Sequence, residues 1–337
     1  MITRRHFVGG LALGQQTAFG AAAPAGGLQR ALAGPLVLAL MAPSQAPDAV
    51  RANWRLLADK LAGRLGVAVE LEVPRQYADV VKAAVSGHAH VAWLSNASAL
   101  EAVESGRTEV FATMQVRGPD GQALSGYRSQ VVVRDDSPIR SVEDLLAKGK
   151  SLTLRMGDAK STSGYIIPYY YLFARRGLNP TDLFRAVLTG NHAENMSAVI
   201  SGETDAATTN DEEVKKLAQL DAGSARRLRV VWSSQEIRQS PLLWSVALPS
   251  DVRAAIKEEV LGFGRTSAEQ QVLMAMNRVV RFVPSSNRQL QPIADIDLFT
   301  ARRALAANTS FTPAQKTAAE ASINARATRL EMLLKRS

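Results

Sequence analysis

Apolar and polar residues along the chain form short blocks that predict strands separated by helices. An apolar block at residues 35–40 indicates a buried strand, and apolar residues then recur at helical spacing until Gly66. The apolar positions of that expected helix are Val50, Trp54, Leu57, Leu61 and Leu65. Further strands are expected at residues 67–73, 90–94 and 110–116, with helices at 79–86 and 97–105. Strands that alternate with short helices are typical of βαβ units with a parallel sheet.

A second α/β unit is expected after residues 118–121, where glycine and proline indicate a turn. Its expected strands cover residues 130–133, 151–156, 184–188, 204–208 and 228–232. Its expected helices cover residues 142–147, 165–174, 194–201 and 211–220. A strand at 242–248 is expected to return to the first sheet, and residues 252–334 have a helical pattern.

The order of these segments predicts an α/β fold of two lobes, with the second lobe inserted into the first. The first lobe is expected to comprise residues 30–126 and 240–337, including the C-terminal helices, and the second lobe residues 127–239. The chain would cross between the lobes twice, near residues 125–127 and 233–239, which makes a two-segment hinge beside a cleft. Because ligands of open α/β sheets bind beyond the carboxyl ends of the strands, the cleft is the expected binding site.

The N-terminus has the features of an export signal. Arg4 and Arg5 form a twin-arginine pair, a weakly apolar stretch runs to Ala23, and small residues offer a cleavage site, so residues 1–25 resemble a twin-arginine signal. The alternative is an Ala-rich disordered tail. Cleavage would leave the mature protein in a bacterial periplasm, and because the chain has no Cys we expect neither a disulfide nor a lipid anchor.

The net charge favours anionic partners without pointing to nucleic acid. The chain of 337 residues carries 40 Lys and Arg against 31 Asp and Glu, a formal charge of +9. The basic residues are scattered near expected helix ends without interleaved aromatics, which is typical of solvated faces with a general attraction for anions. No 18-residue apolar run follows the N-terminus, so we expect no transmembrane helix.

The most informative stretch is Ser161-Thr-Ser163, which lies where an expected strand gives way to a helix. A single hydroxyl can cap a helix start. Two further hydroxyls, free backbone N–H groups and the positive end of the helix dipole predict a site for an oxyanion. Gly164 would let the backbone approach the bound group. The alternative is a capped helix with two idle hydroxyls.

Other polar side chains occupy equivalent turns between strands and helices. They are Tyr77, His192, Asn210 and Glu212. A tyrosine hydroxyl and an imidazole N–H are donors suited to an oxyanion. Each has an ordinary alternative: Tyr77 could staple a helix start, His192 could bond locally, and Glu212 could be a first-turn acid favoured by the dipole.

Several motifs together resemble the phosphonate-binding proteins of bacterial ABC importers. Residues 157–168, which read Gly-Asp-Ala-Lys-Ser-Thr-Ser-Gly-Tyr-Ile-Ile-Pro, resemble their signature. So do Val91-Ala-Trp-Leu94, Ser98-Ala-Leu-Glu-Ala-Val, Asp136-Ser-Pro-Ile, Gly190-Asn-His and Pro241-Leu-Leu-Trp. The resemblance covers about residues 36–300 in unbroken order. It implies a type II periplasmic binding-protein fold, no cofactor, and transient delivery of a phosphonate-like anion to an inner-membrane ABC permease.

The resemblance also assigns roles to residues. In that family the phosphonate group sits on a helix start that matches Ser161–Ser163. A histidine that matches His192 and a tyrosine that matches Tyr77 meet the same group. Hydroxyls, N–H groups and an imidazole are thus expected to converge on the anion without a metal.

Two positions depart from the family's best-known members. They carry a second tyrosine where this chain has Leu94, and an acid where it has Ser240. In aminophosphonate binders that acid, with a glutamate matching Glu212, meets the ligand's amine. Our hypothesis is therefore a phosphonate-like ligand other than 2-aminoethylphosphonate.

The sequence lacks the usual marks of an enzyme. There is no Cys, no Gly-x-Ser-x-Gly elbow and no His-Glu-x-x-His motif. Ser161 or Ser163 with His192 could imitate the nucleophile and base of a hydrolase, but no acid evidently orients the imidazole. His88 and His90 would share one face of a strand as a conceivable metal pair without an evident third ligand. We expect no catalytic residue and no metal.

The sequence leaves two questions open: whether the protein serves transport or sensing, and whether it is a monomer or a dimer. A sensory module that reports the same ligand to a membrane receptor kinase would have the same sequence features. The C-terminal helix at residues 313–335 either packs on the first lobe of a monomer or offers a dimer surface.

Overall fold

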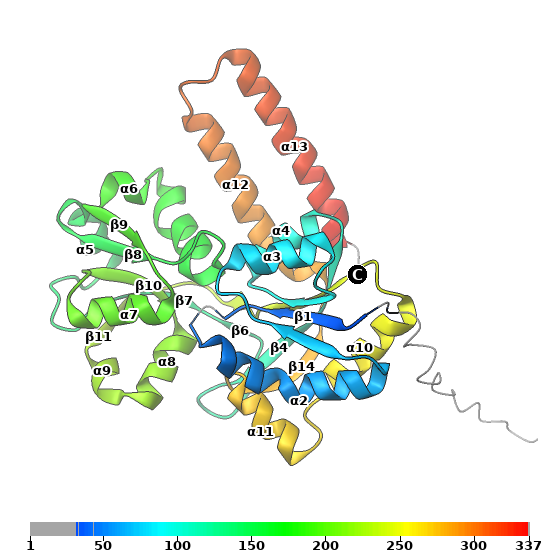
Figure 1. The fold of residues 1–337 in the computed structure, drawn as a ribbon. Helices are drawn as coiled ribbons and strands as arrows, with labels where there is room; N and C mark the ends of the chain where they lie inside the picture. The colour runs from blue at the N-terminus through cyan, green and yellow to red at the C-terminus, as the bar shows by residue number, and fades with distance from the viewer. Residues whose placement is uncertain (1–31, 33, 43, 336–337) are drawn as a thin grey trace, which may run out of the picture.

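The computed structural model describes residues 32, 34–42 and 44–335 (Figure 1). The expected export signal at residues 1–25 lies outside the described residues. In the described part, helices surround one sheet of seven strands and one of five, and a two-stranded ribbon forms a third, small sheet. None of the described helices combines the length and the apolar character needed to cross a membrane. The fold is mixed α/β, as predicted.

The larger sheet has the strand order β14-β4-β13-β3-β1-β2, with β5 paired to β4. The bounds of its strands are β1 Leu36–Leu40, β2 Val69–Glu72, β3 Val91–Trp93, β4 Thr108–Arg117, β5 Ala123–Leu124, β13 Pro241–Ser245 and β14 Val279–Pro284. β1 is parallel to β2 and β3, whereas β13 is antiparallel to β3 and β4. The predicted parallel sheet is therefore confirmed for β1, β2 and β3, but not for β4, which is antiparallel to β13 and β14. The strand expected to return at 242–248 does return, but it inserts between β3 and β4 in the opposite direction.

Helices cover both faces of this sheet, which is why β1 is buried along its whole length (Figure 1). Alternate residues of β1 face opposite sides. One side packs on α2, α10 and α11, and the other on α3, α4 and α13. The bounds of these helices are α2 Pro47–Leu65, α3 Tyr77–Ser86, α4 Asn96–Glu104, α10 Ser250–Gly262, α11 Ser267–Ala275 and α13 Pro313–Lys335. The stripe predicted for the first helix is confirmed, because all five of its residues are buried in α2.

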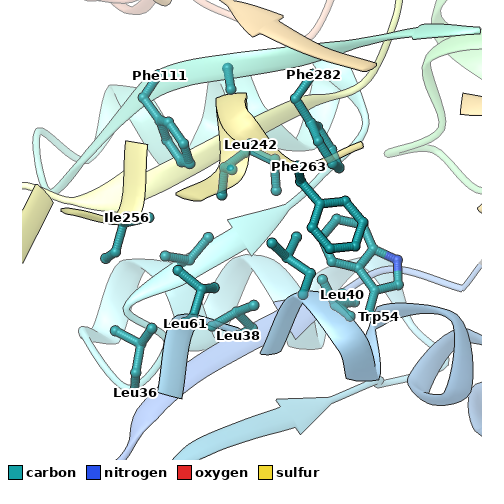
Figure 2. Packing of buried hydrophobic residues seen from close by; sticks show 14 of the residues in the cluster. Leu36, Leu38, Leu40, Trp54, Leu61, Phe111, Leu242, Ile256, Phe263 and Phe282 are labelled. Carbon is teal, nitrogen blue, oxygen red and sulfur yellow. The ribbon is translucent and has the colours of Figure 1, made fainter. Parts of the chain in front are cut away.

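The core under α2 is a continuous cluster of large apolar side chains (Figure 2). Leu38 of β1, Leu61 of α2 and Ile256 of α10 meet there, with Phe111 of β4 beside Leu242 of β13. Burial of such side chains is the dominant favourable term in folding. This core fixes the end of β1 and the start of α2, which the site uses.

The smaller sheet has the order β11-β7-β10-β8-β9. Its strands are β7 Ser129–Arg134, β8 Thr153–Met156, β9 Ala186–Thr189, β10 Ala206–Asn210 and β11 Leu228–Ser233. Around it lie α5 Val142–Ala147, η1 Gly149–Ser151, α6 Pro180–Leu183, α7 His192–Ser201, α8 Asp211–Leu220 and α9 Ala222–Arg226. The three strands β8, β9 and β10 are parallel, and β7 is antiparallel to β10 and β11. The starts of α7 and α8 follow the carboxyl ends of β9 and β10.

The two crossings between the sheets pair with each other. β6, Gly126–Tyr127, is antiparallel to β12, Ile237–Arg238. Gly126 suits this close pairing because a Cβ there would lie 2.6 Å from the carbonyl oxygen of Ile237. The ribbon is therefore short and tightly packed.

The segment expected as a long helix at 165–174 begins earlier and is not a regular α-helix. It consists of two π-helical turns, η2 Thr162–Ile166 and η3 Tyr169–Phe173, followed by the 3-10 turn η4 Ala174–Arg176. Pro168 lies between the two π turns and has no N–H for a regular helical hydrogen bond. π turns inside helices often occur at functional sites.

The prediction of an all-helical C-terminal part is wrong at one place. Residues 279–284 form β14, which pairs antiparallel with β4. Val279 and Phe282 are buried and Arg281 is exposed, so the apolar residues of this strand pack into the core of the larger sheet. The 3-10 turn η5 Asn287–Leu290 and the helix α12 Gln291–Ala307 follow.

The C-terminal helices α12 and α13 form a projecting antiparallel hairpin (Figure 1). Only the last turns of α13 reach the core, through Leu330, Leu333 and Leu334. Arg326 joins the hairpin to the body, because it pairs with Glu104 of α4 and Asp297 of α12. The end of α13 thus packs on the core between the larger sheet and α4.

Truncation of the core under α2 should destabilise the protein. Leu61 is 1% exposed, so Leu61→Ala should lower the free energy of unfolding by about 2–5 kcal/mol through lost burial and a residual cavity. Urea denaturation followed by circular dichroism measures this. Leu220, which is 77% exposed, provides the control, and Leu220→Ala should change stability by less than about 0.5 kcal/mol. Equal effects of the two changes would contradict the assignment of this core.

Candidate functional site

The Ser161–Ser163 turn starts the η2 helix, as its sequence predicted. Ser161 is the N-cap, and its Oγ accepts a hydrogen bond from the N–H of Gly164 at 3.1 Å. Tyr77, at the start of α3, lies beside the Ser161 side chain and lines the same cavities. All three hydroxyl residues of the turn are buried, with exposed fractions of 4% or less. The turn therefore joins a helix start of one sheet to a helix start of the other.

Thr162 makes a second contact between the two halves of the molecule. Its Oγ1 accepts a hydrogen bond from the N–H of Ala97, in the first turn of α4, at 2.8 Å. The carbonyl of Lys160 accepts a hydrogen bond from the Ser95 hydroxyl at 2.9 Å. The oxygen of Thr162 is thus already used, while its hydroxyl proton remains able to donate.

Ser163 brings His192 into the site. Ser163 Oγ lies 3.3 Å from His192 Nε2, at the start of α7. His192 Nδ1 is buried and has no hydrogen-bond partner. Burial lowers the pKa of His192 to about 4, so the ring is neutral near pH 7. One ring nitrogen is held by Ser163 and the other is left for a further partner.

This geometry lacks the third member of a hydrolase triad. A carboxylate normally orients the imidazole through its second nitrogen. No described carboxylate hydrogen-bonds to His192 Nδ1, and an imidazole of pKa about 4 is a weak general base at neutral pH. The pair Ser163–His192 is therefore arranged for hydrogen bonding to a ligand and not for activation of a nucleophile.

Gly164 has a different role from the one predicted. It lines neither cavity described below, and its backbone packs against Gly157. A Cβ at position 164 would lie 2.8 Å from Ser161 Oγ and 2.9 Å from the Cα of Gly157. Its carbonyl also accepts the Thr208 hydroxyl at 2.6 Å. Glycine is required here because the helix start lies directly on the preceding strand end, not because a ligand approaches.

Two adjoining cavities meet at the turn. The inner cavity has a volume of about 80 Å³ and the outer cavity about 600 Å³. Both are lined by Ser44, Gln45, Tyr77, Ser161 and His192. Since a buried water needs about 10–15 Å³, the inner cavity has room for several waters or for one small oxyanion. The outer cavity extends along the residues before α2 and the start of α7.

Most of the predicted site residues line the inner cavity. Among them are Tyr77, Ser161, Thr162, Ser163, His192, Asn210, Glu212 and Ser240. Asn210 is also the N-cap of α8, where its side chain accepts the N–H of Glu213 at 2.9 Å. The structure thus brings together residues that are more than 160 positions apart in the chain.

Leu94 does not join them. It is fully buried in the core between the larger sheet and α4, and it lines neither cavity. Its neighbour Trp93 lines the inner cavity instead, because successive residues of a strand face opposite sides. The inference drawn from Leu94 about the ligand's substituent therefore has to rest on other residues.

Sequence reasoning missed several residues of the inner cavity. Trp93 Nε1 and Ser44 Oγ are buried without a hydrogen-bond partner, as is His192 Nδ1. Burying a polar group without a partner is costly, so three such atoms around one cavity indicate a bound group that pairs with them. Ser44 lies in a Ser-Gln-Ala-Pro turn before α2, a helix-start signal that could have been noticed.

Tyr127 is a further residue that was missed. It belongs to the β6 ribbon, lines the inner cavity and lies beside the Ser163 side chain. Burial raises the pKa of Tyr127 well above its ordinary value, so the hydroxyl keeps its proton. The Tyr77 hydroxyl behaves likewise, because burial raises its pKa to about 12.

The electrostatic character of the inner cavity is unusual for an anion site. No Lys or Arg is among its described lining residues, the acids Glu212 and Glu213 are, and the cavity also has an apolar wall. That wall comprises Met41, Trp93, Met114, Val116, Met276 and Val279. An anion would be met by neutral donors and helix dipoles, with no basic side chain in contact.

The two histidines considered as a metal pair have other partners. His90 Nδ1 accepts the N–H of Val37 at 3.0 Å, and His88 Nε2 lies 2.7 Å from Glu72 Oε1 on the surface. Among the described residues, no cluster of three or more His, Asp or Glu side chains could hold a metal ion.

Over residues 39–290, about three quarters of the chain, the sequence matches the family model of the phosphonate periplasmic substrate-binding proteins of ABC transporters. The chain belongs to this family. A curated relative is the phosphonates-binding periplasmic protein of Escherichia coli (strain K12). It is 33% identical over 284 residues, which are 84% of this chain and 82% of the relative. Members of this family bind substrates for transport and are not enzymes.

Solved structures show the same fold. A binding-protein component of an ABC phosphonate transporter from Pseudomonas aeruginosa superposes with a TM-score of 0.77 at 28% identity, covering 89% of this chain and 97% of that one. PhnD1 of Prochlorococcus marinus (MIT 9301), in complex with methylphosphonate, has a TM-score of 0.65 at 20% identity, with 77% and 96% covered. The fold of this family member is that of the type II periplasmic binding proteins, as the sequence resemblance implied.

The buried neutral His192 should make the stability of the unliganded protein depend on pH. Below about pH 6.5 the imidazole takes up a proton in the unfolded chain, but in the folded protein it does so only near pH 4. As the pH is lowered from about 6.5 to about 4, the free energy of unfolding should therefore fall by about 1.4 kcal/mol per pH unit. Above about pH 6.5, His192 should make no contribution to the pH dependence of stability. Urea denaturation at a series of pH values, compared with His192→Gln, isolates this contribution.

The exposed His88 is the matched control for this prediction. His88→Gln should keep the wild-type loss of stability on acidification, whereas His192→Gln should reduce it by about 3 kcal/mol over the window. Parallel curves for wild type and His192→Gln would show that the ring is not buried in its neutral form.

Proposed function

We propose that this chain captures a small phosphonate-like oxyanion in the inner cavity and delivers it to an ABC permease. The observation that carries the proposal is the set of three buried, unpartnered polar atoms around the cavity, on Ser44, Trp93 and His192. They face a helix start with three hydroxyl residues in a member of a phosphonate-binding family. A tetrahedral anion has enough acceptor oxygens to pair with donors from several directions.

The neutral character of the site suits binding that must also be reversible. Hydroxyls of Ser161, Thr162 and Ser163 and the imidazole N–H replace the water shell of the anion without a permanent countercharge. Tyr77 is placed to add a hydroxyl from the other side, since it already contacts Ser161. Relatives support this assignment, because PhnD1 with the same fold holds methylphosphonate.

The ligand we propose is not 2-aminoethylphosphonate. Ser240, which lines the inner cavity, has a hydroxyl where aminophosphonate binders have a carboxylate. Three methionines and a tryptophan form the apolar wall of the cavity, and they offer no strong acceptor to an ammonium group. A phosphonate with a small uncharged substituent, phosphite or phosphate fits this environment better.

Capture would involve closure of two lobes about the β6–β12 ribbon. The first lobe would comprise residues 30–126 and 240–337, and the second residues 127–239. The hydrogen bond between Thr162 and Ala97 then joins the lobes directly beneath the ligand. The outer cavity would serve as the route of approach, since it shares five lining residues with the inner one.

The cellular setting follows from the family and the N-terminal sequence. We infer export through the twin-arginine signal at residues 1–25, with its cleavage, and transient docking of a monomer on the inner-membrane permease. Membership of a transporter family favours this role over a sensor that reports to a receptor kinase.

Removal of one hydroxyl of the turn should weaken anion binding. Ser163→Ala removes a donor and the partner of His192, and a hydrogen bond to a charged group is worth about 1.5–3 kcal/mol, so we expect a loss of about ten- to a hundredfold in affinity for methylphosphonate. Isothermal titration calorimetry measures it. The control is Ser250→Ala at the exposed start of α10, which should bind like wild type. Unchanged affinity in Ser163→Ala would contradict the assignment.

The identity of the ligand can be tested directly. Protein purified from its periplasm and then denatured should release a phosphorus compound that phosphorus NMR and mass spectrometry identify. In titrations of ligand-free protein, methylphosphonate, phosphite or phosphate should bind more tightly than 2-aminoethylphosphonate. The reverse order would overturn the proposed selectivity, and the absence of binding by all four would overturn the proposed function.

A further inference from the structure

The inner cavity contains two carboxylates, and neither is free. Glu212 lies in the first turn of α8, with Gln239 Nε2 2.6 Å from its Oε1 and Asn277 Nδ2 3.4 Å from its Oε2. Glu213 also lines the cavity and pairs with Lys216 at 3.8 Å. A buried carboxylate is the natural partner of a cationic substituent, so the groups that already occupy these two acids decide what the cavity accepts.

Asn277 is brought to Glu212 by an uncommon backbone conformation. Asn277 and Arg278 have φ angles of 68° and 62°, the only described non-glycine residues in the left-handed region. This region is disfavoured for residues with a Cβ and is tolerated best by Asn and Asp among them. The turn lies between α11 and β14, and it directs the Asn277 amide across to α8. Such local strain is found mainly where a side chain has to be placed for function.

Gln239 is fixed from the other side. It follows the β12 strand of the ribbon, is 5% exposed, and its N–H donates to the Ser125 carbonyl at 3.1 Å. Its own carbonyl accepts the Thr113 hydroxyl at 3.0 Å. With its backbone held at both ends, its side chain has little freedom to leave Glu212. Two amides from separate parts of the chain therefore converge on one carboxylate.

Apolar residues surround the group formed by Glu212, Gln239 and Asn277. Met276 and Val279, on either side of the Asn277 turn, line the inner cavity and are buried. Glu212 and Asn277 also line a separate cavity of about 190 Å³, so they stand in the wall between the two. Burial raises the pKa of Glu212 to about 7 although the hydrogen bond from Gln239 acts in the opposite direction, so burial reduces its negative charge at neutral pH. A ligand in the inner cavity would therefore meet a Glu212 whose oxygens already have partners.

We propose that Gln239 and Asn277 are specificity-determining residues: they hold Glu212 as an internally satisfied group, so that the site selects phosphonates with uncharged substituents over those that carry an ammonium group. This inference rests on the proposed function of the same cavity. It differs from the missing acid at Ser240, because it names two residues that occupy the oxygens of an acid still present.

The test uses two ligands of equal size. Propylphosphonate and 2-aminoethylphosphonate have the same number of heavy atoms in the substituent and differ in a terminal methyl or ammonium group. The ratio of their dissociation constants, measured by calorimetry in one protein, cancels any general loss of binding. Gln239→Leu with Asn277→Gly removes both amides, and we expect the ratio to shift at least about tenfold towards the ammonium ligand, since a charge-assisted contact becomes available.

Asn277→Gly alone keeps the test decisive if the double variant fails to fold, because glycine suits the left-handed conformation at this position. It should shift the ratio in the same direction by about threefold or more. Adding Glu212→Gln to the variants should abolish the shift, since the freed carboxylate is its cause. A ratio that stays at the wild-type value in a folded variant, judged by circular dichroism, overturns the inference. Failure of wild type to bind any phosphonate would instead overturn the proposed function.

Discussion

The start of the η2 helix at Ser161–Ser163 sets the main physical constraint on this protein. Unpaired N–H groups, hydroxyls and the positive end of the dipole meet there in a buried place. No basic side chain is among the described lining of the inner cavity, so the neutral donors have to be held in position beforehand. The strand-to-helix connections, the packing of Gly164 on Gly157 and the contacts of Tyr77 and Tyr127 all serve that position.

The same constraint explains why the site is divided between two sheets. Helix starts from both sheets point at one small volume: α3 with Tyr77, η2 with its three hydroxyls, and α7 with His192. Donors from two sheets can approach an anion from opposite sides. Contacts such as Thr162 with Ala97 therefore link the recognition of the ligand to the relative position of the two halves. Coupling of this kind is what a carrier that must bind and later release requires.

Selectivity depends on the polar groups that are already satisfied as much as on those that are not. Ser44, Trp93 and His192 keep atoms without partners, whereas Glu212 has two amide partners. Unsatisfied donors are suited to acceptor oxygens, and a satisfied, largely apolar wall is suited to an uncharged substituent. The cavity therefore has a polar end and a neutral wall built from different parts of the chain.

Local patterns in the sequence determined the secondary structure and the core of the candidate site. Helix caps and apolar periodicity depend on residues within four positions of one another, so the α2 stripe, its end at Gly66 and the Ser161 cap could be predicted. Tertiary structure decided the rest. Pairing with β4 made residues 279–284 a strand, strand direction placed Trp93 and not Leu94 at the cavity, and long-range packing brought Gln239 and Asn277 to Glu212. These outcomes depend on contacts between distant segments, which no short window of sequence contains.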